Sequence, residues 1–323
     1  MKAIVQHGYG SDADPVGSLV FEEVDAPTIG ADDVLVRVRA ASVNAADWFI
    51  ALGRPYLIRA VSGLRTPRIP VAGKALAGVV EAVGPGVTTF AAGDEVYAEA
   101  AGGAFAELVS VPSGRVARKP AGLTFEEAAA IPLAGTTALQ GLRDVGRLCA
   151  GQTLLVNGAS GGVGTFAVQI GTALGAEVTG VCSTRNVDLV RSLGADHVLD
   201  YTREELSGRY DVILDLVGNH SLSQLRGALT AHGTAVLSAG QGGRVLGPLG
   251  RIARATFLSA TVPQRLRPLV ATHRVADLDA LTAMVDAGAL VPSIERTYPL
   301  SATADAVRHL GVDHARGKIV VVP

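Results

Sequence analysis

Hydrophobic and polar positions follow two different patterns along the 323-residue chain. From residue 1 to about 120 the apolar runs are short and are separated by Gly, Pro, Asp and Ser, as in a β-barrel or β-sandwich. The expected strands are 3–6, 19–24, 34–41, 77–83, 95–100 and 105–111. The segment 44–71 looks irregular, and a long segment of this kind in a compact domain is often functional.

From about residue 121 strand and helix patterns alternate. Thr124 and Glu127 predict a capping box at the start of a helical stretch that runs to about residue 148, with interruptions at Pro132 and Gly135. The expected strands are 153–157, 178–182, 197–199, 212–216 and 234–238, and the helices between them start near Gly162, Asn186, Arg203 and His220. This alternation predicts an α/β fold with a doubly wound parallel sheet and helices on both faces.

The remaining part of the chain shows fewer regular elements. Residues 241–262 are rich in Gly and Arg and suggest a loop with a short strand at 256–260. Helices are expected at 278–287 and 301–310, the second capped by Ser301. The chain then closes on a strand at 317–322.

The strongest chemical signal lies between Thr153 and Tyr201. The apolar run 153–157 leads into a turn after which helical spacing begins. The turn consists of Gly158, Ala159, Ser160, Gly161, Gly162, Val163 and Gly164. In such units the first glycine permits a tight turn, the next lets backbone approach a pyrophosphate, and the third lets the helix pack on the strand. Because backbone N–H groups at a helix start bind phosphate, the stretch predicts a dinucleotide site.

The same residues also fit a different class of enzyme. Residues 158–162 spell G-x-S-x-G, the nucleophile elbow of α/β-hydrolases, and Ser160, Asp215 and His232 would supply a triad. However, the parallel sheet starts at this turn, and Gly164 has no function in an elbow. The dinucleotide interpretation is therefore favoured over a serine hydrolase.

The end of the second strand indicates which dinucleotide is bound. NAD-binding units usually carry an acid there, whereas this chain has Ser183, Thr184 and Arg185, and the first acid, Asp188, already belongs to the next helix. Ser183 and Arg185 suit a 2′-phosphate, Arg185 through charge-assisted hydrogen bonds. We therefore expect NADP(H) in preference to NAD(H). The alternative for Arg185 is a solvated arginine that caps a loop.

Composition limits the partners and the metal chemistry. The net charge of −2 gives no reason to expect nucleic acid or a membrane as a partner, and the chain shows no membrane-spanning apolar run and no signal peptide. Cys149 and Cys182 are the two cysteines, which suggests a reducing, cytoplasmic setting. Because no histidine pairs with a cysteine at ligand spacing, no metal site is expected.

Motifs along nearly the whole chain carry a family resemblance. They are MKAIV (1–5), SVNAADW (42–48), AGVVEAVG (77–84), GDEVY (93–97), GTTA (135–138), NGASGGVG (157–164), LGAD (193–196), DY (200–201) and RGKIV (316–320). Together they resemble the zinc-independent quinone oxidoreductase branch of the medium-chain dehydrogenase/reductase superfamily. The resemblance implies a GroES-like β-barrel domain at 1–120, completed by about 268–323, and a Rossmann domain that binds NADP(H) at 121–267. A homodimer is also expected.

The resemblance further implies individual site residues. Asn44 is expected to face the nicotinamide, Tyr56 to be the active-site tyrosine, Thr136 to touch the nicotinamide ring and Tyr201 to stack near the adenosine phosphate. The residues expected to line the cofactor are Leu216, Val217, Gly218, Ser238, Ala239, Gly240, Leu258 and Ser259. Zinc-dependent relatives carry a cysteine at Asn44 and Gly-His-Glu at residues 73–75, where this chain has Gly-Lys-Ala.

The implied reaction is hydride transfer from NADPH to a quinone or to the C=C bond of an α,β-unsaturated carbonyl. Tyr56 and Asn44 would stabilise the charge on the carbonyl oxygen. Alternatively, Tyr56 only packs and Asn44 bonds its own backbone. Lys74 either faces solvent or contacts an anionic substrate. Two other functions stay open: an enoyl reductase of a biosynthetic pathway, and a non-catalytic dinucleotide-binding protein that senses redox state.

Overall fold

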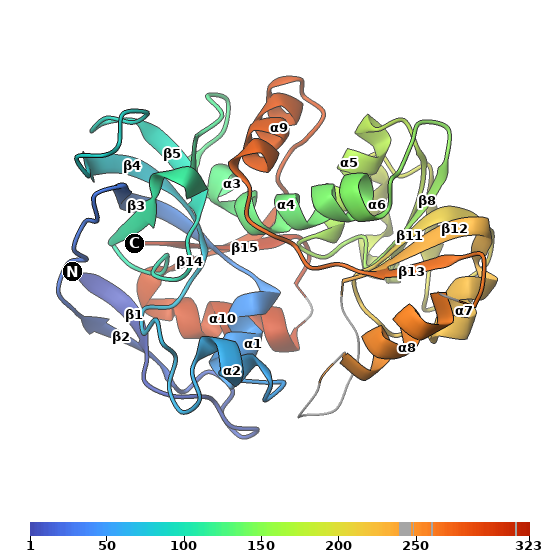
Figure 1. Ribbon diagram of the computed structural model, residues 1–323, viewed down its shortest axis with the longest axis horizontal. Coiled ribbons are helices and arrows are strands. Elements are labelled where there is room, and N and C mark those ends of the chain that lie inside the picture. Colours follow the sequence, from blue (N-terminus) through green and yellow to red (C-terminus); the bar gives the residue numbers. More distant parts are fainter. Residues whose placement is uncertain (239–246, 248, 260, 314) are drawn as a thin grey trace. The chain divides into compact units, whose positions relative to one another are not determined.

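The structure is a computed structural model that describes residues 1–238, 247, 249–259, 261–313 and 315–323 (Figure 1). It contains two compact units. The first comprises Met1–Ala134, His273–Ala287 and Val291–Pro323, and the second comprises Gly135–Thr272 and Gly288–Leu290. The sequence predicted divisions near residues 120 and 267, whereas the compact units divide after Ala134 and after Thr272.

A seven-stranded sheet forms the frame of the first unit, in the order β14-β15-β3-β4-β5-β7 with β6 paired to β3. A separate antiparallel pair joins β1 and β2. The strands are β1 Lys2–Gln6, β2 Leu19–Glu23, β3 Asp33–Val43, β4 Ala75–Val83, β5 Glu95–Glu99, β6 Leu108–Pro112, β7 Val116–Arg118, β14 Ile294–Pro299 and β15 Lys318–Val322. The last strand of the chain, β15, pairs antiparallel with β3, so the C-terminal segment belongs to this unit.

The strands predicted for this unit are confirmed, with ends that shift by a few residues. Two further strands escaped prediction. The strand β7 has only three residues, too few to show a period. The strand β14 lies at the sheet edge and carries mostly exposed side chains, including Glu295 and Arg296, so it lacks the apolar alternation of a half-buried strand.

Helices occupy part of the segment that looked irregular. The helix α1 spans Ala45–Leu52 and α2 spans Ile58–Ser62. Asn44 is the N-cap of α1, its N–H donating to Asp47 Oδ2 at 2.8 Å, and Gly53 ends the helix with a left-handed φ of 60°. These end signals were present in the sequence, and the expectation of an irregular 44–71 segment is wrong at both helices.

The remaining helices of this unit are α3 Phe125–Ala130, α9 Val275–Asp286 and α10 Thr303–Val312. The capping box of Thr124 and Glu127 is confirmed at the start of α3. Ser301 does not cap α10, because a short 3-10 turn, Leu300–Ala302, precedes the helix and makes Ala302 its N-cap residue. The helix α10 packs against α1, and both elements lie side by side in Figure 1.

A buried polar cluster connects β15, the end of β3 and the start of α1. Lys318 is only 2% exposed, and its Nζ donates to Val43 O at 3.0 Å and to Asn44 Oδ1 at 2.5 Å. Asn44 Nδ2 donates to Ser42 O at 2.8 Å. The opposite amide orientation would turn an N–H toward the Lys318 ammonium, so Lys318 determines which way the Asn44 amide faces.

Burial shifts the protonation equilibria of this cluster. Burial lowers the pKa of Lys318 to about 7, although the negative charge of Asp47 acts in the opposite direction. Burial raises the pKa of Asp47 to about 6, against the lowering effect of its backbone hydrogen bond and of Lys318. Burial disfavours the charged form of each group, so the pKa of Lys318 falls, the pKa of Asp47 rises, and the two values approach each other.

The second unit is built on a six-stranded sheet in the order β10-β9-β8-β11-β12-β13, with all neighbouring strands parallel. Its strands are β8 Thr153–Asn157, β9 Glu177–Cys182, β10 His197–Asp200, β11 Tyr210–Asp215, β12 Leu229–Leu237 and β13 Arg265–Pro268. Its helices are α4 Pro132–Leu139, which begins in the first unit and continues as a π-helical turn at Gln140–Val145, α5 Gly164–Ala173, α6 Val187–Ser192, α7 Leu222–Gly227 and α8 Leu249–Ser259. The predicted parallel sheet is confirmed.

One predicted helix is absent. The residues that follow Arg203 form turns and extended backbone instead of a helix. Only residues 201–209 join β10 to β11, and this connection must pass β9 and β8. Nine helical residues would span only about 13 Å, whereas returning to the opposite edge of the sheet past two strands takes roughly 20 Å. The connection is therefore extended because it is too short to be helical.

The expected strand at 256–260 is also wrong over its described residues. Residues 256–259 belong to α8, in which Ala255 is buried and Leu258 packs against the core. This spacing of three residues fits a helix. The real strand is β13, in which Leu266 is buried between the exposed Arg265 and Arg267, and it pairs with β12 at the sheet edge.

The buried lysine predicts an unusual pH dependence of stability. The unfolded chain holds the Lys318 proton up to the ordinary lysine pKa, whereas the folded protein releases it near pH 7. Between pH 7 and 10 the unfolded state binds more protons, so the free energy of unfolding rises with pH there. Lys318→Met removes this contribution. We expect the stability advantage of the wild type over the variant to grow by at least about 1 kcal/mol between pH 7 and pH 9.5, measured by urea unfolding.

Lys2→Met, at an exposed lysine of the same unit, serves as the control and should show the wild-type pH profile. Parallel profiles for Lys318→Met and the wild type would show that Lys318 stays charged in the fold.

Candidate functional site

The order of strands in the second unit reverses between β8 and β11. From β8 the chain proceeds through β9 to β10 on one side, and from β11 through β12 to β13 on the other. In open parallel sheets, ligands bind at the carboxyl ends of the strands where this direction reverses. Asn157 and Asp215 end the two strands that flank the reversal. Figure 1 labels these strands, β8 and β11.

The glycine turn lies directly after Asn157. Gly158 has a φ of 90°, a left-handed conformation that favours glycine, and an added Cβ would lie 2.8 Å from Val217 Cγ2. An added Cβ on Gly164 would lie 2.1 Å from Gly158 O, so this position permits the contact between helix and turn. At Gly161 the nearest atom to an added Cβ is Gly158 O at 3.4 Å, which leaves open space above the backbone. The three glycines thus have the separate functions that a pyrophosphate-binding turn requires.

Asn186 connects this turn to the end of β9, and sequence reasoning missed it. Its Nδ2 donates to Ser160 Oγ at 2.9 Å and to Ser183 Oγ at 3.3 Å. Asn186 is 5% exposed, and its Oδ1 has no hydrogen-bond partner among the residues that the structure describes. An orphaned acceptor of this kind fits a ribose hydroxyl as donor. The residues of the turn and of the β9 end therefore fit a dinucleotide.

An acid from the neighbouring strand lies close to this end. Asp200 ends β10, and Asp200 Oδ2 accepts a hydrogen bond from Thr184 Oγ1 at 2.5 Å. Asp200 Oδ1 accepts from Thr202 N at 3.0 Å and from Thr202 Oγ1 at 2.7 Å. These bonds hold the pKa of Asp200 below its ordinary value. The Asp200 carboxylate is therefore occupied by hydroxyl groups. The guanidinium of Arg185, at the same end of the sheet, is exposed.

A second polar cluster shapes the loop that follows β11. Asp215 is completely buried, and its Oδ1 accepts from Asn157 Nδ2 at 2.8 Å and from Gly218 N at 2.9 Å. Its Oδ2 accepts from Arg251 Nη2, a residue of α8, at 2.6 Å. Removing one partner of a buried pair leaves an uncompensated charge and typically costs about 3–5 kcal/mol. Asp215 therefore holds both sides of this reversal in one arrangement.

The contacts of this cluster also argue against the hydrolase triad of Ser160, Asp215 and His232. Asp215 binds Arg251 rather than a histidine, and Ser160 Oγ accepts from Asn186. His232 lies five residues before Leu237, which pairs with Asp215 across β12 and β11. Five strand residues span about 16 Å, so His232 lies toward the opposite edge of the sheet. The residues of the proposed triad are not brought together.

The other predicted cofactor residues lie at different places. Thr136 is buried within α4, and Tyr201 is exposed directly after β10. Leu216, Val217 and Gly218 follow β11, and Ser238 follows β12, all at the carboxyl edge. Ala239 and Gly240 lie outside the described residues.

Leu258 and Ser259 lie elsewhere in the unit. They end α8, and Ser259 Oγ accepts from Leu266 N near the start of β13 at 3.1 Å. Because β13 starts at the amino edge of the sheet, this placement argues against a cofactor contact. The carboxyl end of β13 at Pro268, which sequence reasoning missed, lies at the cofactor edge instead, where Leu269 N donates to Leu237 O at 2.9 Å.

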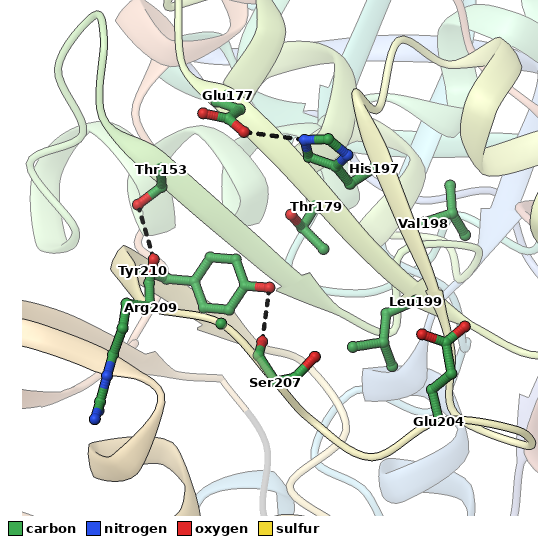
Figure 2. Close-up of a pocket in the computed structure, with 11 residues that line it drawn as sticks. Thr153, Glu177, Thr179, His197, Val198, Leu199, Glu204, Ser207, Arg209 and Tyr210 are labelled. Atoms are coloured by element: carbon green, nitrogen blue, oxygen red, sulfur yellow. Dashed lines mark hydrogen bonds and ion pairs between the residues drawn. The ribbon is translucent and has the colours of Figure 1, made fainter.

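A cavity of about 280 Å³ lies at the amino edge of the same sheet (Figure 2). Thr153, Glu177, His197 and Tyr210, the first residues of β8, β9, β10 and β11, line it. Figure 2 shows the contact between Glu177 and His197, in which Glu177 Oε1 and His197 Nε2 are 3.0 Å apart. The β10–β11 connection forms the other wall of the cavity through Glu204, Ser207, Gly208 and Arg209. The cavity therefore lies at the edge of the sheet opposite to the glycine turn.

A cavity of about 380 Å³ lies within the first unit. Its walls are largely apolar, and Asp47 and Lys74 line it. Asn44 is 4% exposed and lies one helical turn before Asp47, with its amide bonded to Lys318 and Ser42. One Nδ2 hydrogen of Asn44 remains beyond the bond to Ser42, so a donor function for this amide stays a prediction.

Tyr56 is 40% exposed, and arginines flank its ring. The guanidinium of Arg59 lies 4.8 Å from the ring centroid and that of Arg54 lies 5.9 Å from it. Arg59 also lies 4.3 Å from the ring centroid of Tyr9. Packing therefore orders Tyr56, and its catalytic function stays a prediction.

The described residues contain neither a metal-binding cluster nor a membrane-spanning helix. No three His, Cys, Asp or Glu side chains in these ranges come together as a metal-binding group. No helix of the described part is long and apolar enough to cross a bilayer.

Two family models match the chain. The alcohol dehydrogenase GroES-like domain matches residues 30–121, and the zinc-binding dehydrogenase family matches residues 193–321. A chloroplast envelope quinone oxidoreductase homolog from Arabidopsis thaliana is 33% identical, over 100% of this chain and 98% of that protein. An NADPH-dependent alkenal/one oxidoreductase from the same plant is also 33% identical, over 100% of this chain and 80% of that protein.

A solved structure agrees with these relationships. The quinone oxidoreductase from Coxiella burnetii superposes with a TM-score of 0.87 at 27% identity, covering 100% of this chain and 99% of that chain. The match extends over both units: the sheet order with its glycine turn is the expected Rossmann arrangement, and the first unit contains the matched GroES-like domain. The chain therefore belongs to the medium-chain dehydrogenase/reductase superfamily, in its quinone oxidoreductase-like branch.

Proposed function

We propose that the protein is an NADPH-dependent oxidoreductase that reduces a quinone or the C=C bond of an α,β-unsaturated carbonyl. The observation that carries this proposal is the glycine turn at the reversal of strand order, with its open space at Gly161. The printed names of the relatives, a quinone oxidoreductase homolog and an NADPH-dependent alkenal/one oxidoreductase, support the two substrate classes. A bound nicotinamide cofactor would supply the hydride.

The chain's own residues would hold the cofactor in three places. Backbone N–H groups of residues 158–164 would bind the pyrophosphate, and Asn186 Oδ1 would accept from a ribose hydroxyl. Ser183 and Arg185 would bind the 2′-phosphate, which favours NADP(H) over NAD(H). Asp200 supports this preference because hydroxyls of Thr184 and Thr202 already occupy it.

Charge that develops on the substrate oxygen needs a hydrogen-bond donor, and the family resemblance offers two candidates. Tyr56 O–H is the exposed candidate, and Asn44 Nδ2 is the buried one. The zinc-dependent chemistry of some relatives is not expected here, because Asn44 and Lys74 occupy the positions at which the family resemblance places zinc ligands. An amide and an ammonium are poor zinc ligands.

Turnover tests the proposed reaction. Purified protein should oxidise NADPH when a quinone or an enone is added, measured by the loss of nicotinamide absorbance. Preincubation with EDTA should leave the rate unchanged, since no metal takes part. A rate that falls with EDTA and recovers with zinc would contradict the mechanism. Cofactor binding without turnover across a quinone and enone panel would instead favour a redox-sensing protein.

Arg185 tests the cofactor preference. Arg185→Asp should raise the KM for NADPH roughly tenfold to hundredfold, because a charge-assisted bond to phosphate is lost, while the KM for NADH changes little. Arg191→Asp, at an exposed arginine of α6, is the matched control and should affect neither. Equal KM values for NADPH in the wild type and Arg185→Asp would remove Arg185 from the site.

Tyr56→Phe tests the proposed donor. Loss of one donor to a developing oxyanion typically costs about 3–4 kcal/mol, so kcat should fall roughly a hundredfold or more while the KM for NADPH is kept. Tyr298→Phe removes a hydroxyl that contacts His309 in the same unit and provides the control. An unchanged kcat for Tyr56→Phe would show that this ring only packs between Arg54 and Arg59.

A further inference from the structure

The cavity of the first unit combines apolar walls with cationic side chains. Ile50, Ile58, Val61, Ile69 and Phe105 contribute to its apolar lining. Its volume of about 380 Å³ lies in the range usual for small-molecule sites, which are mostly apolar with a few polar groups that orient the ligand. The charged side chains among its lining residues are Asp47, Arg68 and Lys74.

The two cations have little compensation from the protein. Lys74 Nζ donates to the main-chain oxygen of Ala101 at 3.1 Å, and Arg68 Nη2 lies 3.5 Å from the main-chain oxygen of Ala60. In the described part of the chain, neither takes part in an ion pair with a carboxylate. Backbone oxygens satisfy N–H groups but do not cancel their charge.

Asp47 offsets only part of the positive charge, because it is one carboxylate against two cations. It is 7% exposed, its Oδ2 already accepts from Asn44 N, and Lys318 faces it from the buried side. Its negative charge also interacts with Lys74, so Asp47 offsets one of the two cations that line the cavity. The cavity therefore has a positive electrostatic balance, which favours an anionic ligand group.

The backbone holds Lys74 in a defined place. The preceding residue, Gly73, has a φ of 90°, and an added Cβ there would lie 2.6 Å from the Phe105 ring. Ala104 N donates to Gly73 O at 3.1 Å, and Ala100 N donates to Lys74 O at 2.7 Å. These contacts fix the backbone of both residues directly before β4 begins. The ammonium therefore extends from a rigid support rather than from a free loop.

We propose that this cavity binds an anionic group of the substrate, with Lys74 as the main contact and Arg68 as the second. The substrate would then be an apolar enone or quinone that carries a carboxylate or a phosphate. This inference rests on the proposed oxidoreductase function and specifies its substrate class. It also gives Lys74, which the sequence left between solvent and substrate, a definite partner.

A matched set of substrates tests the proposal. (E)-9-oxodec-7-enoate carries an enone and a carboxylate on one apolar chain, and its methyl ester is the neutral match. The acid should have a KM about tenfold or more below that of the ester, as expected for a hydrogen bond between charged partners. An analogue with a terminal phosphate in place of the carboxylate distinguishes the two anion sources. Equal KM values for acid, phosphate and ester would overturn the proposal.

Variants of Lys74 locate the effect. Lys74→Met should raise the KM for the acid about tenfold and leave that for the ester unchanged, whereas Lys74→Arg should restore most of the preference. Lys2→Met is the control, because Lys2 is an exposed lysine of the same unit and does not line the cavity. A loss of activity with acid and ester alike in Lys74→Met would assign a different function to Lys74 and contradict the proposal.

Binding without turnover separates this inference from the function on which it rests. The saturated analogue 9-oxodecanoate and its methyl ester cannot be reduced at C=C, and calorimetry measures their affinity in the presence of NADP⁺. Tighter binding of the acid, lost in Lys74→Met, would support the anion site even if no enone were reduced. Turnover of the ester with no preference for the acid would overturn the anion site and leave the oxidoreductase function intact.

Discussion

The hydrogen bond between Asn157 and Asp215 joins β8 and β11, the two parallel strands at which the strand order of the sheet reverses. It lies at the end of β8 and β11, where the glycine turn leaves on one side and residues 216–218 leave on the other. Because Asp215 also binds Gly218 N and Arg251, one buried carboxylate organises two loops and a helix. The geometry of the carboxyl edge of the sheet therefore depends on this carboxylate as well as on the glycines.

The first unit uses a comparable device with the opposite sign of charge. Lys318 arrives from the last strand of the chain and bonds to Val43 O and Asn44 Oδ1, at the junction of β3 and α1. A buried ammonium is costly, and it is tolerated here because oxygens accept its hydrogen bonds and Asp47 lies near it. The C-terminal strand is thus tied to the segment that leads into the cavity, which explains why the unit needs residues from both ends of the chain.

Local patterns predicted the parts of this structure that depend on neighbours in sequence. The strands from β8 to β12 and the functions of Gly158, Gly161 and Gly164 follow from alternation and turn chemistry within a few residues. Asn186, which bridges the turn to β9, and the pair of Asp215 and Arg251 depend on residues far apart in sequence, so no local period indicates them. The helix that was expected after Arg203 failed for a related reason, because the distance it had to cross is set by the sheet.

The proposed cofactor and substrate sites use different kinds of group. This difference explains why the sequence indicated the cofactor site and not the substrate site. Backbone N–H groups bind phosphates, and they need only small residues in a fixed order, which a single sequence displays. The proposed substrate contacts are side chains, Lys74 and Arg68, which form no ion pair with a carboxylate within the described residues. Lys74 follows Gly73 in sequence, yet its environment is made by Asp47, Ala101 and Phe105. Lys74 donates to a backbone oxygen and not to a carboxylate, and this arrangement comes from the fold rather than from any local sequence pattern.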